Sequence, residues 1–323
     1  MSDAKVYVAG HRGMVGSGVV RRLKAAGYTN IVTRPHSELD LTRQAEVEEF
    51  FKAERPEIVL LAAARVGGIL ANDTYKAEFI YQNLAIATNV IHAAWQSGVR
   101  KLVNLGSSCI YPKFAHQPMK ESALLSGALE RTNEPYAIAK IAAIKLCRYY
   151  NEQYGTNFIS AMPTNLYGPG DNYDLETSHV LPALIRKFSD AKKSIPDGSD
   201  APVTLWGDGT PMREFLYVED LADALVYLLE NVDAQRMREA SPDYFVNVGT
   251  GTDVTIRELA ETIADVVGWS GEMRWDTTKP NGTPRKLMDV SRMTELGWTA
   301  KTGLREGIEK TWEWYKSHGV TAV

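Results

Sequence analysis

The chain is poor in cysteine and carries no excess of positive charge. Its 323 residues include two cysteines, Cys109 and Cys147, which are too few for a disulfide framework and typical of a reducing compartment. A net charge of −4 does not suit a nucleic-acid surface, so any local basic cluster is expected to serve an anionic small molecule. No unbroken apolar run can span a bilayer, and the first residues, MSDAK, lack a signal-peptide core. We expect a cytoplasmic protein that binds neither membrane nor nucleic acid, and we predict no metal site.

Internal repeats and low-complexity tracts are also absent, and strand and helix patterns alternate instead. Apolar runs typical of buried parallel strands cover residues 6–9, 58–63, 101–105 and 158–162. Helical patterns separate these runs, at residues 14–26, 43–54, 78–96 and 135–154. The alternation predicts the α/β class, with a doubly wound parallel sheet of the Rossmann type.

The pattern changes after Asn165. A strand followed by a helix is expected at residues 214–229, with Asp220 in the N-cap region of the helix. A further strand is expected at 245–248, and amphipathic helices at 255–267 and 304–316. We predict a dinucleotide-binding domain over residues 1–165, joined by part of 212–248, and an interleaved, smaller substrate-binding domain over 166–323. The second domain is expected to close over the carboxyl edge of the sheet, where ligands bind.

A glycine-rich turn, GHRGMVG, follows the first apolar run and precedes a helical pattern. This context is typical of dinucleotide sites, because Gly10 allows a tight turn and Gly13 lets the backbone approach the pyrophosphate. Gly16 permits close packing of the helix, whose N-terminal N–H groups favour phosphate. The alternative is a tight strand-to-helix connection that binds nothing.

The second predicted strand, residues 30–33, is not followed by the acidic residue that binds the ribose 2′-hydroxyl in NAD sites. The chain continues instead with Arg34, Pro35 and His36, and Arg12 in the glycine turn is a second cation. Two guanidinium groups suit a 2′-phosphate, so the sequence predicts NADP(H) rather than NAD(H). In the alternative interpretation Arg34 is a solvated loop charge.

Tyr136 and Lys140 are four residues apart in NEPYAIAKIAAIKL, a spacing that places both side chains on one face of a helix. A phenol ordinarily titrates near pH 10, and a neighbouring ammonium favours its ionised form. We therefore expect Lys140 to lower the pKa of Tyr136, and the pair suits proton transfer at a carbonyl or alcohol oxygen. By itself the spacing also occurs by chance in amphipathic helices.

Together these motifs resemble the extended short-chain dehydrogenase/reductase superfamily, through GHRGMVG, LGSSCIYP at 105–112, the Tyr136/Lys140 pair, MPTNLYGPGDN at 162–172 and GTPMREFLYVEDLA at 209–222. The chain is similar to the GDP-L-fucose synthase family in VGGI at 66–69, SSCIYPK, NEPYAIAKIA and KPNGTPRKL at 279–287. The similarity extends over nearly the whole chain. One departure is His36, where that family carries arginine, so either Arg34 or His36 is expected to contact the 2′-phosphate.

The resemblance implies a reductase centre and an NADP(H) site. Ser107 would hydrogen-bond the C4 oxygen of the substrate, Tyr136 would supply the proton, and Lys140 would also hold the ribose hydroxyls. The implied cofactor contacts are Gly10, His11, Arg12, Gly13, Met14, Val15, Gly16, Arg34, His36, Leu105, Gly106, Ser107, Ser108, Lys140, Pro163, Thr164, Asn165, Leu166 and His179.

The resemblance also implies epimerisation at C3 and C5, with Cys109 and His179 as the proton-transfer pair. A C4 ketone acidifies the neighbouring C–H bonds, a thiol near positive charge becomes an effective base, and a histidine can carry a proton either way. Which of the two is the base remains open. Cys147, in an apolar helix stripe, is expected to be packing.

The substrate implied is a GDP-sugar, the ketone GDP-4-keto-6-deoxy-D-mannose, with GDP-L-fucose as the product. Its implied contacts are Asn165, Lys187, Trp206, Arg213 and Asp276. The helix at 78–96 is apolar around much of its circumference, and the family pairs such helices between subunits, so a homodimer is expected.

Two other functions stay open. A UDP-sugar 4-epimerase or a dehydratase could use the same scaffold, but the first gives no role to Cys109 and His179, and the second typically needs acidic groups beside the tyrosine. A non-catalytic NADP(H)-sensing module is the alternative from another class. The intact set of Ser107, Tyr136 and Lys140 argues against it.

Overall fold

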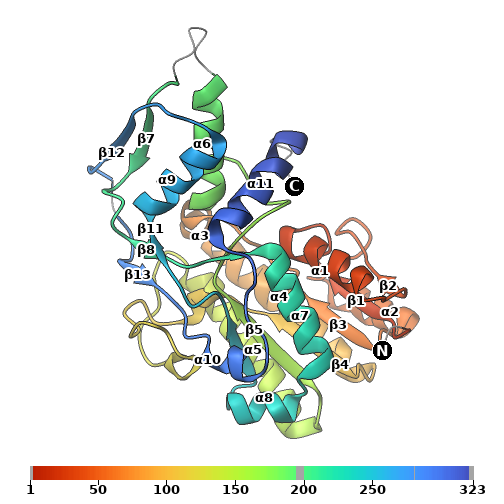
Figure 1. The fold of residues 1–323 in the computed structure, drawn as a ribbon. Helices are drawn as coiled ribbons and strands as arrows, with labels where there is room; N and C mark the ends of the chain where they lie inside the picture. Colours follow the sequence, from red (N-terminus) through yellow and green to blue (C-terminus); the bar gives the residue numbers. More distant parts are fainter. Residues whose placement is uncertain (1–2, 194–199, 280, 320–323) are drawn as a thin grey trace.

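A six-stranded parallel sheet runs through the computed structural model, which describes residues 3–193, 200–279 and 281–319 (Figure 1). The strands are β1 (Val6–Ala9), β2 (Ile31–Val32), β3 (Ile58–Leu61), β4 (Lys101–Leu105), β5 (Phe158–Pro163) and β10 (Phe245–Val248). Their order is β10-β5-β4-β3-β1-β2, and all pairs are parallel. The chain order reverses between β1 and β3, which opens a crevice at their carboxyl ends where open α/β sheets bind ligands.

Helices cover both faces of this sheet. One layer holds α1 (Met14–Ala25) and α7 (Val218–Asn231), and the other holds α2 (Gln44–Glu54), α4 (Lys76–Gln96) and α5 (Glu134–Tyr154). Side chains of β1 alternate between the layers because successive residues of a strand point to opposite faces. Val6 and Val8 belong to the core that contains residues of α1 and α7, whereas Tyr7 and Ala9 belong to the core that contains residues of α2 and α4. The predicted doubly wound sheet is confirmed.

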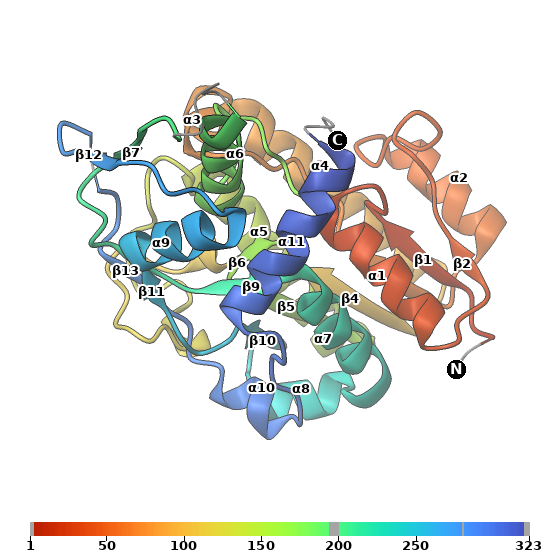
Figure 2. The same ribbon diagram turned by 45° about the horizontal axis from the view of Figure 1, so that its top comes forward.

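A second core lies beyond the carboxyl edge, among α6 (Val180–Lys193), α9 (Ile256–Val267) and α11 (Leu304–His318). It is completed by a two-stranded sheet of β7 (Val203–Trp206) and β12 (Met273–Asp276). In Figure 2, as in Figure 1, α11 lies between α9 and α1.

Two small sheets connect this part to the large sheet: β6 (Asn165–Tyr167) with β9 (Phe215–Tyr217), and β11 (Val254–Thr255) with β8 (Met212–Arg213) and β13 (Arg285–Lys286). The shorter helices are α3 (Ile69–Thr74), α8 (Ala234–Ala240) and α10 (Ser291–Glu295), with 3₁₀ turns η1 (Ser108–Ile110) and η2 (Glu121–Ala123). Within the described residues, none of the helices combines the length and the apolar character needed to cross a bilayer.

Asp220 lies at the N-terminal end of α7, as predicted, but it is not the capping residue. The N-cap of α7 is Tyr217, and Asp220 lies in the first turn of that helix. Its buried carboxylate instead accepts hydrogen bonds from the backbone N–H groups of Lys301 and Thr302, at 2.8 and 2.7 Å. A long-range loop therefore uses this carboxylate, which sequence spacing alone assigned to its own helix.

Candidate active site

The glycine turn takes the shape that its sequence predicts. Gly10 has φ of +83°, and a Cβ there would come within 2.7 Å of the Ala63 backbone. A Cβ on Gly16 would clash with the carbonyl oxygen of Gly10, so both positions require glycine. Gly13 is the N-cap of α1, with neither a capping side chain nor an acidic residue in the first turn, where Met14 and Val15 stand. The N–H groups at this helix end are thus suited to a pyrophosphate.

The cations predicted for the 2′-phosphate differ in their surroundings. The guanidinium of Arg34 pairs with Glu54 at 2.5 Å, donates to the carbonyl of Thr33 at 2.8 Å and stacks over the ring of Phe50. Arg34 is therefore committed to neighbours in the protein, because a carboxylate and an aromatic face already hold its charge.

Arg12 and His36, by contrast, are accessible. Arg12 is exposed, and its side chain makes no hydrogen bond or ion pair within the part of the chain that the structure describes. His36 has 82% of its side chain exposed and lies 3.8 Å from Asp40. These two residues are the better candidates for a 2′-phosphate contact.

Other predicted cofactor residues lie where strands of the sheet end. Leu105 closes β4, and the N–H of Gly106 donates to the carbonyl of Ala161 at 2.9 Å. Pro163 closes β5, followed by Thr164 and by β6, which contains Asn165 and Leu166. Since parallel strands end at one edge, these residues and the glycine turn border the same crevice.

Ser107, Tyr136 and Lys140 meet beyond the end of β4. Ser107 is the N-cap of η1, and η1 packs against α5, the helix that carries the other two residues. The Ser107 side chain is near enough to the Tyr136 phenol to lower the pKa of that group. The Lys140 ammonium lies 5.6 Å from the centre of the Tyr136 ring and donates to the carbonyl of Leu105 at 2.8 Å. The i, i+4 spacing thus delivers both side chains to one place.

The electrostatic prediction for this pair is wrong. Burial raises the pKa of Tyr136 well above its ordinary value, the neighbouring Cys109 raises it further, and the hydrogen bond with Ser107 lowers it only in part. Burial also lowers the pKa of Lys140 to about 8. Desolvation is the largest effect on both groups, so the phenol keeps its proton at neutral pH.

Cys109 lies in the same 3₁₀ turn, two residues after Ser107. It is 9% exposed, and its N–H donates to the Ser107 hydroxyl at 3.4 Å. Burial raises the pKa of its thiol, whereas the hydrogen bond with Ser107 and the charges of Lys286 and Lys140 lower it. Cys147, in contrast, is fully buried in the core between α5 and the sheet, as predicted.

His179 precedes α6, in a loop whose Thr177 carbonyl accepts from the N–H of Gly68 at 3.1 Å. The imidazole is exposed to water, yet the protein around it, followed by the charge of Lys286, lowers its pKa.

Lys286 is the residue that the sequence reasoning missed. Its ammonium interacts electrostatically with Cys109, Arg213 and Glu130, and it lowers the pKa of His179. The residue ends β13, where it is the register partner of Arg213 on β8. Lys286 lies in the KPNGTPRKL segment, residues 279–287, which supports the family resemblance but to which the sequence analysis assigned no chemical role.

The predicted substrate residues fall into two groups. Trp206 and Asp276 are register partners at the ends of β7 and β12, and Lys187 donates to the Thr204 carbonyl of β7 at 3.4 Å. The Trp206 side chain is 67% exposed, as a stacking surface requires, whereas the Asp276 carboxylate is bound by Thr278.

The second substrate group contains Arg213 and Asn165. Arg213 donates to its neighbour's carbonyl at 2.7 Å and lies beside Lys286, so two cations share this part of the cleft. The amide of Asn165 donates to the carbonyl of Glu214 at 2.8 Å.

Comparisons with known proteins agree with this geometry. The sequence profile described as NAD dependent epimerase/dehydratase family matches residues 6–249. The chain is 58% identical over 317 residues to GDP-L-fucose synthase 1 of Arabidopsis thaliana, with 98% of this chain and 94% of that protein covered. It is 54% identical over 317 residues to GDP-L-fucose synthase of Escherichia coli (strain K12), with 98% and 97% covered.

A solved structure, the GDP-mannoheptose C4 reductase from Campylobacter jejuni with NADP bound, is 40% identical and has a TM-score of 0.89, covering 98% of this chain and 99% of that one. These findings support a nicotinamide cofactor for this chain. The chain belongs to the NAD dependent epimerase/dehydratase family, and within it to the group of the GDP-L-fucose synthases.

Proposed function

We propose that the protein converts GDP-4-keto-6-deoxy-D-mannose to GDP-L-fucose, by epimerisation at C3 and C5 and reduction at C4 with NADPH. The observation that carries this proposal is the joint placement of Ser107, Cys109, Tyr136 and Lys140 beyond the end of β4. A reductase needs the serine, tyrosine and lysine. The added thiol and His179, on both of which the charge of Lys286 acts, give the site a second chemistry.

In the reduction, NADPH supplies the hydride when bound, and Tyr136 supplies the proton. The raised pKa of Tyr136 suits this direction, because the phenol must be protonated when the sugar oxygen becomes an alkoxide. Ser107 donates a second hydrogen bond to the same oxygen and so stabilises its developing charge. Lys140, fixed by the Leu105 carbonyl, keeps its ammonium near the Tyr136 ring and would hold the ribose hydroxyls of the bound cofactor.

In the epimerisation, Cys109 and His179 exchange protons at the carbons beside the ketone. The ketone stabilises the enolate that forms when a base removes a proton from C3 or C5. Ser107 and Tyr136, which hydrogen-bond the C4 oxygen, stabilise that enolate as well as the alkoxide. One hydrogen-bonding pair therefore serves both reactions.

The cations of the cleft suit the GDP part of the substrate. Arg213 and Lys286 lie next to each other, an arrangement that is unfavourable without an anion and favourable with a diphosphate. Trp206 offers an exposed ring for the nucleotide or sugar, and Lys187 a half-buried cation. NADP(H) is proposed over NAD(H) because Arg12 is free to bind a 2′-phosphate, and a 40% identical neighbour carries NADP.

Incubation with GDP-4-keto-6-deoxy-D-mannose and NADPH in deuterated water tests the proposal. The expected product is GDP-L-fucose with solvent deuterium at C3 and at C5, formed as NADPH is consumed. A reduced sugar without deuterium at C3 and C5 would show that the protein reduces the ketone but does not epimerise it. NADPH binding without turnover would favour the sensing module instead.

We also propose that the protein forms a homodimer through α4 and α5, which pack against each other. These helices expose large apolar side chains, namely Tyr81, Ile138, Tyr149 and Tyr154. Covering them with the same face of a second copy would remove this surface from water. Sedimentation velocity should give a dimer that Tyr149→Glu weakens, and a monomeric wild type would contradict the proposal.

A further inference from the structure

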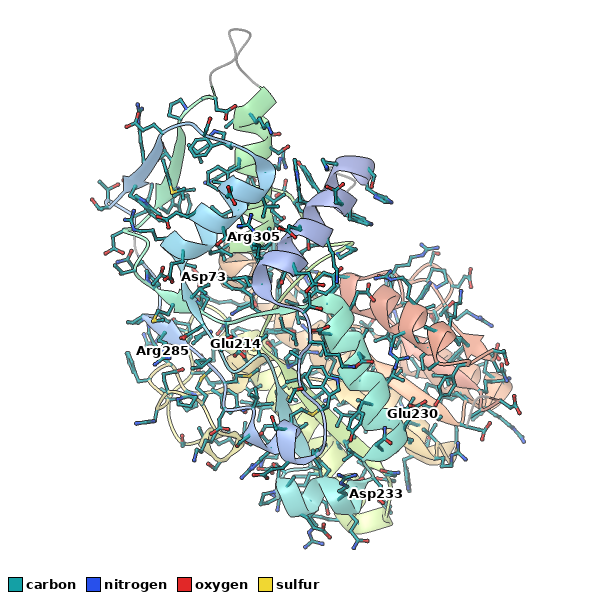
Figure 3. All side chains as sticks on the ribbon, in the orientation of Figure 1. Asp73, Glu214, Glu230, Asp233, Arg285 and Arg305 are labelled. Carbon is teal, nitrogen blue, oxygen red and sulfur yellow. The ribbon has the colours of Figure 1, made fainter. Side chains whose placement is uncertain are left out.

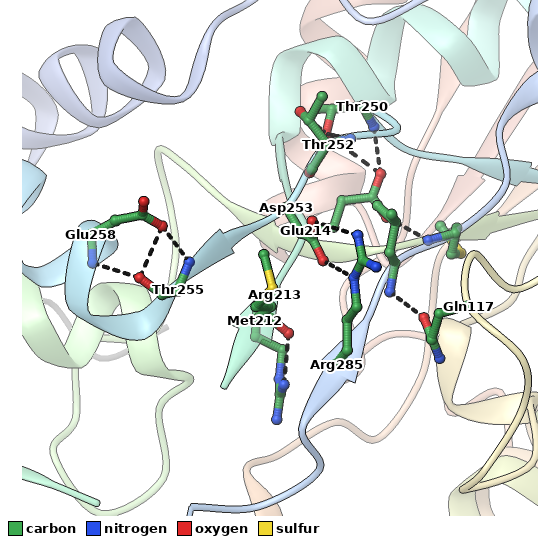
Figure 4. Close-up of polar contacts among 12 residues, drawn as sticks. Gln117, Met212, Arg213, Glu214, Thr250, Thr252, Asp253, Thr255, Glu258 and Arg285 are labelled. Atoms are coloured by element: carbon green, nitrogen blue, oxygen red, sulfur yellow. Dashed lines mark hydrogen bonds and ion pairs between the residues drawn. The ribbon is translucent and has the colours of Figure 1, made fainter. Parts of the chain in front are cut away.

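Glu214, the residue between β8 and β9, is fully buried, and its carboxylate is bound by two separate stretches of main chain (Figure 3, Figure 4). Oε1 accepts from the N–H groups of Thr250 and Gly251, at 2.7 and 2.8 Å. Oε2 accepts from the N–H of Met288 at 3.0 Å. Burying a carboxylate is costly unless its oxygens are satisfied, and these donors provide that compensation.

The same residue holds the segment that carries Lys286 at two points. The Glu214 N–H donates to the carbonyl of Lys286 at 3.3 Å, while its Oε2 holds Met288. Between these points the N–H of Leu287 donates to the side chain of Gln117 at 2.8 Å. The backbone from the Lys286 carbonyl to Met288 is therefore fixed, and the Lys286 side chain starts from a defined position.

Lys286 acts electrostatically on the two residues proposed to carry out epimerisation. The groups that act on Cys109 are the Ser107 hydroxyl and the charges of Lys286 and Lys140, and Tyr136 is also a neighbour. Lys140 is committed to the Leu105 carbonyl, whereas Lys286 interacts electrostatically with both Cys109 and His179. A fixed ammonium favours a thiolate and disfavours an imidazolium.

We infer that Glu214 is a positioning residue for the epimerisation centre, where it acts by holding the Lys286 ammonium beside Cys109 and His179. The inference rests on the proposed function for the roles of those two residues. Glu214 itself is screened from the substrate by its complete burial, so its effect must pass through Lys286.

Glu214→Gln tests this inference at one contact. The amide oxygen can replace Oε1 and accept from the N–H groups of Thr250 and Gly251. The NH₂ group then faces the N–H of Met288, and two donors cannot form a hydrogen bond. The segment around Lys286 is released, while the other contacts stay. The ionisation of Cys109 is followed by the ultraviolet absorbance of its thiolate, with Cys109→Ser as the blank. We expect this absorbance to appear at higher pH in Glu214→Gln than in the wild type. A rise of about one pH unit corresponds to roughly tenfold less thiolate at neutral pH, and deuterium should enter C3 and C5 about tenfold more slowly.

Lys286→Met should give the same two changes, and the double variant should add little to either single one. Asp220→Asn is the matched control, since Asp220 is another buried carboxylate that holds a loop through two backbone N–H groups. It should lower thermal stability and leave the thiolate titration unchanged.

An unchanged thiolate titration in Glu214→Gln, or in Lys286→Met if the first variant does not fold, overturns the inference. An equal shift in Asp220→Asn would overturn it too, because the effect would then be general loosening. The titration uses the free enzyme, so it still decides this inference if the wild type fails to incorporate deuterium and the proposed function is wrong.

Discussion

Lys140 offers a direct test of the electrostatics of the site, because its charge is buried at the expense of stability. Burial lowers the pKa of Lys140 from 10.5 to about 8. At about 1.4 kcal/mol for each pH unit, this difference corresponds to about 3 kcal/mol against the ammonium in the folded protein. Lys140→Met removes that cost and keeps the packing, but it gives up a charge-assisted hydrogen bond to Leu105, about 2 kcal/mol. The variant should be more stable than the wild type by about 1 kcal/mol at neutral pH.

The sign of the pH dependence follows from the same values. The pKa in the folded state lies below that in the unfolded state, so the unfolded chain binds more protons between about pH 8 and 10.5. Wild-type stability therefore rises through this window. The advantage of Lys140→Met is complete below about pH 8 and is lost by pH 10.5.

Urea unfolding at several pH values measures the effect, and NADPH oxidation should fall in the same variant because the ribose and Tyr136 lose their ammonium. Lys145→Met is the control on the same helix, since Lys145 is paired with Asp243 at 2.5 Å on a partly exposed surface. It should cost about 1 kcal/mol or less. A folded Lys140→Met that is no more stable than the wild type at neutral pH would refute the reasoning.

Three further changes address the other parts of the site. Tyr136→Phe should slow ketone reduction about 10²–10⁴-fold, measured as NADPH oxidation in a single turnover, while deuterium still exchanges into the sugar. A reduction rate close to that of the wild type would exclude the phenol as the proton donor. Gly16→Ala places a methyl group against the Gly10 carbonyl, so it should destabilise the fold by about 1–3 kcal/mol in urea unfolding. It should also weaken NADPH binding in a fluorescence titration. An unchanged affinity would contradict a role for the close packing of Gly16 on Gly10 in cofactor binding. Arg12→Gln should weaken NADPH by about 1.5–3 kcal/mol and leave NADH unaffected, whereas equal losses for both cofactors would show that Arg12 does not contact the 2′-phosphate.

The sequence by itself determined the parts of this protein that depend on local geometry. The bounds of β1, β4 and β10 follow from apolar runs, and the glycine turn follows from backbone conformations that only glycine tolerates without strain. The approach of Tyr136 and Lys140 follows from helical periodicity. In each case the deciding interactions lie within a few residues of one another, so the pattern can be read directly from the chain.

The tertiary structure decided the charges of the site, because desolvation and ion pairing depend on residues far away in the sequence. Glu54, twenty residues beyond Arg34, takes the guanidinium that the pattern offered to the 2′-phosphate. Enclosure of Tyr136 raises a pKa that a neighbouring lysine was expected to lower. Lys286, on a strand that pairs with β8 and is followed by the Glu214-bound Met288, interacts electrostatically with Cys109 far away in the sequence. Sequence spacing contains no measure of burial, and burial determines which of these charges are stable.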